Sequence, residues 1–244
     1  MATSYALMYK RLADFFVENM NFKGVSNIIE VGCGKGQLTI PFVEKITRFK
    51  KHFKLVAFDM SAGPYEGDLN VLEKKISTER LGRLITVVRG DVTDMRTMGN
   101  ESFDIVVSNE LLCDLNRGGL ERAFKEFHRI LRPEGQMVHG ELSPVPESEA
   151  QRLLIEADGF GESVQPHPKW FSPYSDEVAA LLHKTGFRNI RTEYFETKVK
   201  MTCKEAIRQL KQWNIDSAFI QSHLTELETN GLELPLEHVI FCEK

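Results

Sequence analysis

Three glycines at alternate positions follow a short apolar segment near the start of the chain. Gly32, Gly34 and Gly36 come directly after residues 28–31 and precede a segment of helical character that begins at Leu38. Glycine lets a backbone turn sharply and leaves no side chain between that backbone and a ligand at the following helix N-terminus. We therefore interpret this turn as a loop that holds a cofactor.

The neighbours of the glycines indicate which kind of ligand the loop takes. A dinucleotide-binding loop would follow the pattern Gly-x-Gly-x-x-Gly, but position 37 is Gln37. The preceding apolar run also contains Glu30, whose carboxylate would repel a pyrophosphate. A ligand with a cationic, amino-acid-like portion fits better. The alternative is that the glycines serve only the packing of a strand against a helix.

Further polar side chains stand where other predicted strands end. Asp59, Asp91 and Asn109 each close or follow an apolar run that is typical of a buried strand. In an open α/β sheet, ligands lie at the carboxyl ends of the parallel strands. Taken singly, Asp59 could be a helix N-cap and Asp91 could cap a turn. Their joint placement at one predicted sheet edge favours a binding site.

The pattern Glu-x-Gly-x-Gly-x-Gly over residues 30–36 resembles the first motif of the class I S-adenosylmethionine-dependent methyltransferases. The resemblance extends over about residues 25–145, including the sequence Leu-Arg-Pro-Glu-Gly at 131–135 before a fifth strand, and continues more weakly toward residue 244. It implies a Rossmann-like, doubly wound α/β fold. The expected sheet is mostly parallel and seven-stranded, with an antiparallel final strand and helical lid insertions.

The same resemblance implies S-adenosylmethionine as the cofactor. The glycine turn would accommodate its methionine portion, Glu30 would orient the amino group, and Asp59 would accept the ribose hydroxyls. The cofactor-binding residues expected from the resemblance are Glu30, Gly32, Gly34, Gly36, Gln37, Asp59, Met60, Asp91, Val92 and Asn109.

Length and composition are typical of one globular enzyme domain over residues 1–244. The chain is 42% hydrophobic and 27% charged, and its net charge of -4 offers no general attraction to nucleic acid or to acidic membranes. No apolar stretch approaches membrane-spanning length, and residues 1–5 lack the form of a secretion signal. The four cysteines are scattered. We expect a cytoplasmic protein with reduced thiols and no metal site.

The pattern of apolar residues separates a core from covering segments. We expect the core at about 25–145, 174–201 and 236–244, and the cover at 1–24, 142–173 and 202–235. The expected elements outside the first half are helices at 6–20, 147–157 and 175–184, a sixth strand at 189–201, two helices after Thr202 and a final strand at 237–242. The two late helices resemble a lid over a substrate, or alternatively form a packing extension or a dimer surface.

Methyl transfer is an in-line displacement, so the enzyme chiefly aligns the donor and the acceptor and needs a base only if the acceptor must lose a proton. The candidate bases or orienting groups are Glu141, which we prefer because it ends a strand, Asp114 and His167. His139 shares the strand face of Glu141 but is better explained as a core histidine. The candidate substrate-binding residues are Tyr9, Trp170, Tyr174 and Arg208. Trp170 and Tyr174 could equally serve only to hold a loop against the core.

The end of the fourth strand narrows the methyl acceptor. It reads Ser108-Asn109-Glu110-Leu111, unlike the Asn-Pro-Pro-Tyr type of sequence in relatives that methylate adenine or protein glutamine. No basic extension is present. We expect a small or medium-sized metabolite as acceptor. The rival hypotheses are an acceptor in a protein or structured RNA, and a non-catalytic subunit that keeps the fold.

Overall fold

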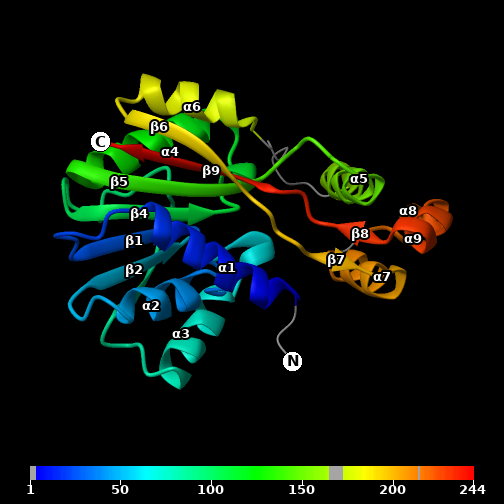
Figure 1. The fold of residues 1–244 in the computed structure, drawn as a ribbon, viewed down its shortest axis with the longest axis horizontal. Coiled ribbons are helices and arrows are strands. Elements are labelled where there is room, and N and C mark those ends of the chain that lie inside the picture. Colours follow the sequence, from blue (N-terminus) through cyan, green and yellow to red (C-terminus); the bar gives the residue numbers. More distant parts are fainter. Residues whose placement is uncertain (1–3, 165–172, 214) are drawn as a thin grey trace.

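The computed structural model describes residues 4–164, 173–213 and 215–244. The main sheet has the strand order β3-β2-β1-β4-β5-β9-β6 (Figure 1). Strands β1 to β5 are parallel, while β9 runs antiparallel to both β5 and β6. The predicted seven-stranded sheet with an antiparallel final strand is confirmed. The strands are β1 (Asn27–Val31), β2 (Lys54–Asp59), β3 (Ile85–Arg89), β4 (Phe103–Asn109), β5 (Leu131–Leu142), β6 (Arg188–Phe195) and β9 (Glu237–Glu243).

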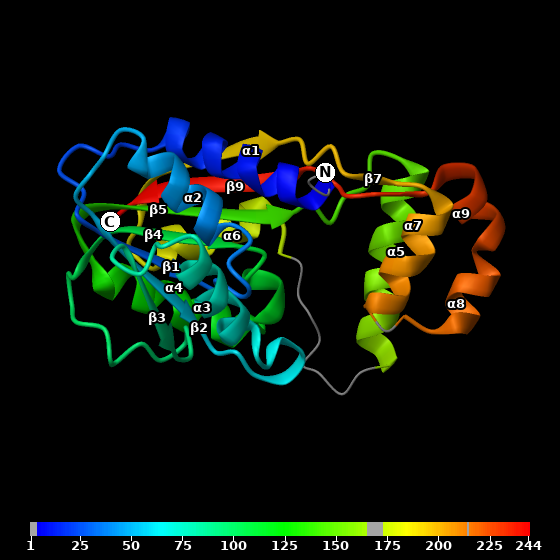
Figure 2. The same cartoon turned by 90° about the horizontal axis from the view of Figure 1, so that it is seen from below.

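Helices cover both faces of the sheet because the strands are apolar on both sides (Figures 1 and 2). In β2, for example, Leu55 and Ala57 pack in one core, and Phe58 packs in the other. The first core is shared with α1, α2 and α3, and the second with α4 and α6. These helices are α1 (Ser4–Asn19), α2 (Thr39–Thr47), α3 (Asp68–Thr78), α4 (Arg117–Ile130) and α6 (Ser175–Lys184), with short 3-10 turns η1 (Gly63–Tyr65) and η2 (Leu112–Asp114).

The remaining elements form a helical extension beyond the carboxyl ends of β4 and β5 (Figure 2). Leu153, Leu210 and Leu227 are fully buried in it. Most of the packing is internal, since α5 lies against β8 and α9, and α7 lies against α8, α9 and β7. The extension consists of α5 (Glu149–Val164), β7 (Lys200–Met201), α7 (Cys203–Gln212), α8 (Ser217–Ser222), α9 (Leu224–Asn230) and β8 (Leu232–Glu233).

Three boundary predictions in this region are wrong. The sixth strand ends at Phe195 rather than at 201, because Lys198 has a positive φ of 53° that an extended strand does not allow. Helix α5 continues past 157 to Val164 through two glycines that were expected to mark a loop. The pair of helices expected after Thr202 is three helices, with a break at His223.

Candidate functional site

The glycine loop connects β1 to α2, and its three glycines all have positive φ angles. An added Cβ would lie 2.8 Å from Leu111 Cδ1 at Gly32 and 2.3 Å from Leu72 Cδ1 at Gly36. At Gly34 the nearest atom would be 3.8 Å away. Gly32 and Gly36 therefore also serve internal packing, whereas Gly34 faces space that a ligand can enter.

Asp59 ties the glycine loop to the end of β2. Its Oδ2 accepts a hydrogen bond from the Gly34 amide at 2.9 Å, and its Oδ1 accepts one from the Ser61 amide at 2.6 Å. Asp59 is not a helix N-cap, because α3 begins later, after Gly67. Its half-buried carboxylate thus lies directly beside the loop.

Glu30 is buried beneath the same loop, at the end of β1, with 3% of its surface exposed. None of the described residues hydrogen-bonds its Oε2. Burial raises the pKa of Glu30 to about 8, and the neighbouring Asp59 carboxylate acts in the same direction. A cationic group of a ligand would supply the partner that this oxygen lacks.

The remaining residues of the expected cofactor site differ from one another in burial and in hydrogen bonding. Asp91 is exposed, and its Oδ1 accepts hydrogen bonds from the Thr93 amide and hydroxyl, both at 2.8 Å, as the turn-capping alternative requires. Val92 is buried and Met60 is exposed. The Oδ1 atom of Asn109 is buried and has no hydrogen-bond partner in the described part of the chain.

A cavity of about 380 Å³ lies between α1 and the start of α2. Its lining includes Gly36 and Gln37 of the glycine loop together with Tyr5 and Tyr9 of α1. The expected placement of Tyr9 and Gln37 near the loop is therefore seen in the structure.

Glu141 is buried at the end of β5, and the hydrogen bonds that it receives from described residues go to Oε2. They come from the amides of Leu112 at 3.0 Å and Cys113 at 3.3 Å. His139 Nε2 also lies 3.3 Å from Glu141 Oε2, while His139 Nδ1 contacts Ser108 Oγ at 2.8 Å. One oxygen of Glu141 thus helps to hold η2, the turn after β4.

The other candidate residues lie on elements other than the glycine loop. Asp114 lies in η2 and accepts a hydrogen bond from the Tyr65 hydroxyl at 3.1 Å. Tyr174 is half exposed before α6, and Arg208 is exposed on α7. His167 and Trp170 lie outside the described residues. The structure also brings in Tyr65, Glu110 and Glu237, which sequence reasoning missed.

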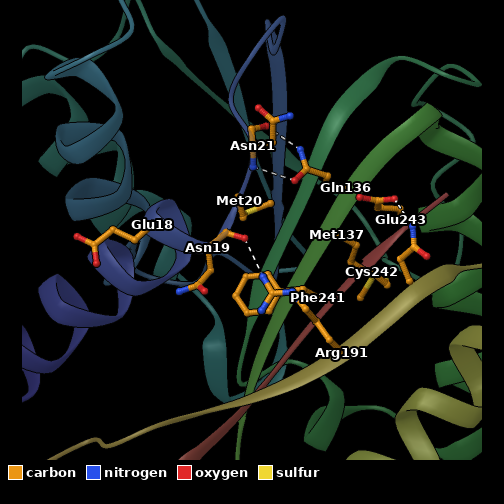
Figure 3. A pocket seen from close by; sticks show the side chains of 11 residues that line it. Glu18, Asn19, Met20, Asn21, Gln136, Met137, Arg191, Phe241, Cys242 and Glu243 are labelled. Carbon is orange, nitrogen blue, oxygen red and sulfur yellow. Dashed lines mark hydrogen bonds between the residues drawn. The ribbon is translucent and has the colours of Figure 1, made fainter.

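A second cavity, of about 440 Å³, lies at the opposite end of the strands (Figure 3). Its polar groups already bond to one another: Gln136 exchanges two hydrogen bonds with the backbone of Asn21, and Arg191 donates to Asn19 O at 2.8 Å while it stacks on Phe241. We therefore place the candidate site at the glycine loop.

Comparisons with known proteins agree with this geometry. Residues 28–135 match the family described as "Methyltransferase domain". An uncharacterized methyltransferase of Schizosaccharomyces pombe is 25% identical over 84% of this chain and 76% of its own length. A tRNA U34 carboxymethyltransferase of Hydrogenovibrio crunogenus is 27% identical over 61% of this chain and 42% of its own. The chain spans between a third and about three quarters of the curated relatives that it matches.

A solved structure shares the fold over almost the whole chain. The S-adenosylmethionine-dependent methyltransferase from Archaeoglobus fulgidus superposes with a TM-score of 0.60 at 18% identity, covering 98% of this chain and 94% of that one. The strand order, together with a glycine loop and acidic side chains at the ends of β1 and β2, defines a Rossmann-like enzyme fold of the methyltransferase type. Residues 28–135 thus match a methyltransferase domain, and the chain has the fold of a solved S-adenosylmethionine-dependent methyltransferase.

Proposed function

We propose that this enzyme transfers the methyl group of S-adenosylmethionine to a small or medium-sized metabolite. The observation that carries the proposal is the burial of polar groups at the carboxyl end of β5, at the start of β9 and on α1. Glu141 is 7% exposed, Tyr9 is 8% exposed and Glu237 is fully buried. A small molecule can enter such a site, whereas the surface of a macromolecule would need these groups to be open to solvent.

The residues at the glycine loop fit the donor. Glu30 has a buried oxygen without a partner, which suits a cationic amino group, and Gly34 leaves space where a side chain would stand. Asp59 would hold ribose hydroxyls next to the loop, and Gln37, Met60, Asp91, Val92 and Asn109 complete the proposed donor site. When bound, S-adenosylmethionine supplies an electrophilic methyl group on a sulfonium. The protein's part is to hold the acceptor in line, exclude water and, where needed, accept a proton.

The remaining assignments on the acceptor side follow from the same proposal. Glu141 is the preferred base, with Asp114 as a second candidate, and Tyr9 borders the cavity beside the loop. Tyr174 and Arg208 lie on elements next to or within the helical extension, where they would contact larger parts of an acceptor. No helix in the described ranges is both long and apolar enough to cross a membrane.

The test is incubation of the enzyme and a labelled methyl donor with a cell extract, followed by mass spectrometry of metabolites, peptides and RNA. We expect the label in a small molecule. Label in RNA or protein alone would contradict the proposed acceptor class, and it is the outcome that the tRNA-modifying relative would suggest.

A matched pair of variants tests the donor site itself. Gly34 and Gly24 both have positive φ, and an added Cβ meets little at either position. Both Gly→Ala changes should cost about 1 kcal/mol of stability through backbone strain. Only Gly34→Ala should also weaken binding of S-adenosylhomocysteine, by at least about tenfold, as measured by calorimetry. Equal donor affinity in the two variants would place the donor elsewhere.

A further inference from the structure

Three carboxylates and two phenols approach one another at the carboxyl ends of β4 and β5. Glu110 directly follows β4, Glu141 lies near the end of β5, and Glu237 is the first residue of β9. Tyr5 and Tyr9 lie one turn apart on α1. We call these five residues the strand-end cluster.

Backbone pairing brings the cluster together from distant parts of the chain. The Glu110 amide donates to Gly140 O at 2.9 Å, and Glu237 pairs with Leu142 in the antiparallel register of β5 and β9. A Cβ at Gly140 would lie 2.3 Å from Asn109 Oδ1 and 2.6 Å from Glu237 Oε2. Gly140 therefore leaves the room in which these two oxygens converge.

The cluster contains buried polar atoms that lack a well-formed hydrogen bond from the described part of the chain. Glu237 is completely buried, and no hydrogen bond of good geometry from the described ranges reaches either of its carboxylate oxygens. The neighbouring Asn109 side chain is the one polar group among the described residues that acts to lower the pKa of Glu237. The hydroxyl of Tyr5 is likewise buried and without a partner there. Glu110, in contrast, is hydrogen-bonded to Tyr9.

The negative charges around Glu237 raise the free energy of its ionised carboxylate. The charged groups that act on it are the carboxylates of Glu110 and Glu141, and burial together with these charges raises its pKa well above the ordinary value. Burial raises the pKa of the Tyr9 hydroxyl, and the carboxylates of Glu110 and Glu237 act in the same direction. An unpaired buried carboxylate costs several kcal/mol unless it is protonated or paired with a cation. The cluster thus favours a positively charged or proton-donating guest.

The cluster lies beside the groups assigned to the donor. Glu30 and Asp59 lie at the ends of β1 and β2, whereas the carboxylates of the cluster belong to β5, β9 and the end of β4, on the far side of β1 in the sheet. Asn109, the donor-site residue at the end of β4, is the point at which the two sites meet. Tyr5 and Tyr9 also line the 380 Å³ cavity that reaches the glycine loop. The cluster therefore adjoins the loop on the side where the helical extension lies.

We propose that the strand-end cluster binds the methyl acceptor through a positive charge, and that the acceptor is a small primary or secondary amine. This inference rests on the proposed function and names the substrate class of that same site. Glu237 and Glu110 pair with the ammonium group, and the two phenol oxygens of α1 border it.

The reaction balances with the cluster as the proton acceptor. An ammonium nitrogen has no lone pair, so one of its protons first passes to the Glu141 carboxylate, the base of the proposed function, while Glu237 and Glu110 hold the nitrogen. The freed lone pair forms the new N–C bond as the C–S bond breaks, and the electron pair of the broken bond stays on sulfur. The product leaves as the methylated ammonium ion, and the proton on Glu141 passes to water.

The first test measures cation binding without turnover. Butylammonium, butyrate and n-butanol are titrated against the protein saturated with S-adenosylhomocysteine, and thermal stabilisation is recorded. We expect stabilisation by butylammonium alone, with Glu237→Gln weakening its affinity at least about tenfold. Glu243→Gln, at the exposed opposite end of the same strand, serves as the control and should bind like the unmodified enzyme.

Equal binding of butylammonium by Glu237→Gln and the unmodified enzyme, or no binding by either, overturns the proposal. Since the Gln change removes a buried acid without changing its shape, we expect the variant to fold, and Glu110→Gln provides a second variant of the same site. A metabolite extract labelled by the enzyme is also separated by cation and anion exchange. Label in the anion-bound or neutral fraction alone contradicts an amine acceptor. Label in no metabolite, combined with Glu237-dependent butylammonium binding, contradicts the metabolite acceptor but keeps the cation site.

Discussion

At the scale of single residues, Glu141 has two roles to reconcile. Its Oε2 accepts hydrogen bonds from two amides of the turn after β4, a structural duty that an uncharged Gln oxygen can also perform. A Gln cannot, however, accept a proton from an acceptor. Glu141→Gln therefore separates the charge of this residue from its hold on the turn.

We predict that Glu141→Gln slows methyl transfer by about 10²–10⁴-fold and leaves the dissociation constant of the donor unchanged, as a proton-accepting group requires. Single-turnover rates at saturating donor, together with calorimetry of donor binding, measure both quantities. An unchanged rate would restrict Glu141 to holding η2, and weakened donor binding alone would move it to the donor site.

Glu30 predicts a pH dependence of stability. Its pKa is about 8 in the folded chain, above the ordinary value of 4.5, so the folded state binds more protons between these values. The free energy of unfolding should therefore fall as the pH rises from about 4.5 to 8, by up to about 1.4 kcal/mol per pH unit. Glu237 contributes with the same sign.

Urea unfolding at pH 5, 6.5 and 8 checks this dependence. Glu30→Gln should reduce the slope, and exposed Glu243→Gln should leave it unchanged. Saturating S-adenosylhomocysteine should also reduce the slope, because its amino group would pair with the ionised carboxylate. A slope identical in Glu30→Gln and the unmodified protein would show that Glu30 is ionised throughout this range.

At the scale of elements, the helical extension packs mainly on itself, while its buried residues continue the hydrophobic core shared by α1 and the sheet. Its β7–β8 ribbon and its helices pack mainly on one another. Arg11 of α1 donates to the carbonyls of Glu196 and Thr197, in the connection between β6 and β7. Inside the extension, the Thr202 amide and hydroxyl both donate to Glu205 Oε2, which defines the start of α7.

We predict that residues 149–164 and 203–230 exchange amide hydrogens faster than β1 and β4 in the free protein. Exchange in both segments should slow when donor product and acceptor are bound together, as expected of a cover that closes over its substrate. Hydrogen exchange with mass spectrometry measures this. Protection in the extension equal to that of the two strands, with or without ligands, would contradict a moving cover.

At the scale of the whole molecule, most of the sheet could be predicted closely because its central strands are apolar runs bounded by turn residues, whereas the edge strand β6 is largely polar and its end was not predicted. The apolar run that Asp59 was expected to close is β2, which ends at that residue, and the helix expected at 175–184 coincides with α6. The break at His223 could not be predicted, since no Pro or Gly marks it and Phe219, Ile220, Leu224 and Leu227 fit a continuous helical face.

The candidate site was predictable only where its residues follow a local pattern. The glycine loop and Asp59 come from adjacent βα turns, so spacing along the chain was enough to predict that they lie side by side. The strand-end cluster joins residues 5, 9, 110, 141 and 237, and only the pairing of β9 with β5 brings the last of these into place. Glu237 also begins a strand that is otherwise mostly apolar, which hides a buried acid from any test of composition.

The helical extension enters the fold as two separate inserts, one after β5 and one between β6 and β9. Both inserts connect strands of the neighbouring group β5, β9 and β6, and neither contributes a strand to the main sheet. The extension is therefore a two-segment cassette. A designer could exchange it between enzymes of this fold at junctions near 145, 174, 197 and 235, while the seven strands and the glycine loop stay unchanged. Duplication and recombination over evolutionary time could make the same exchange.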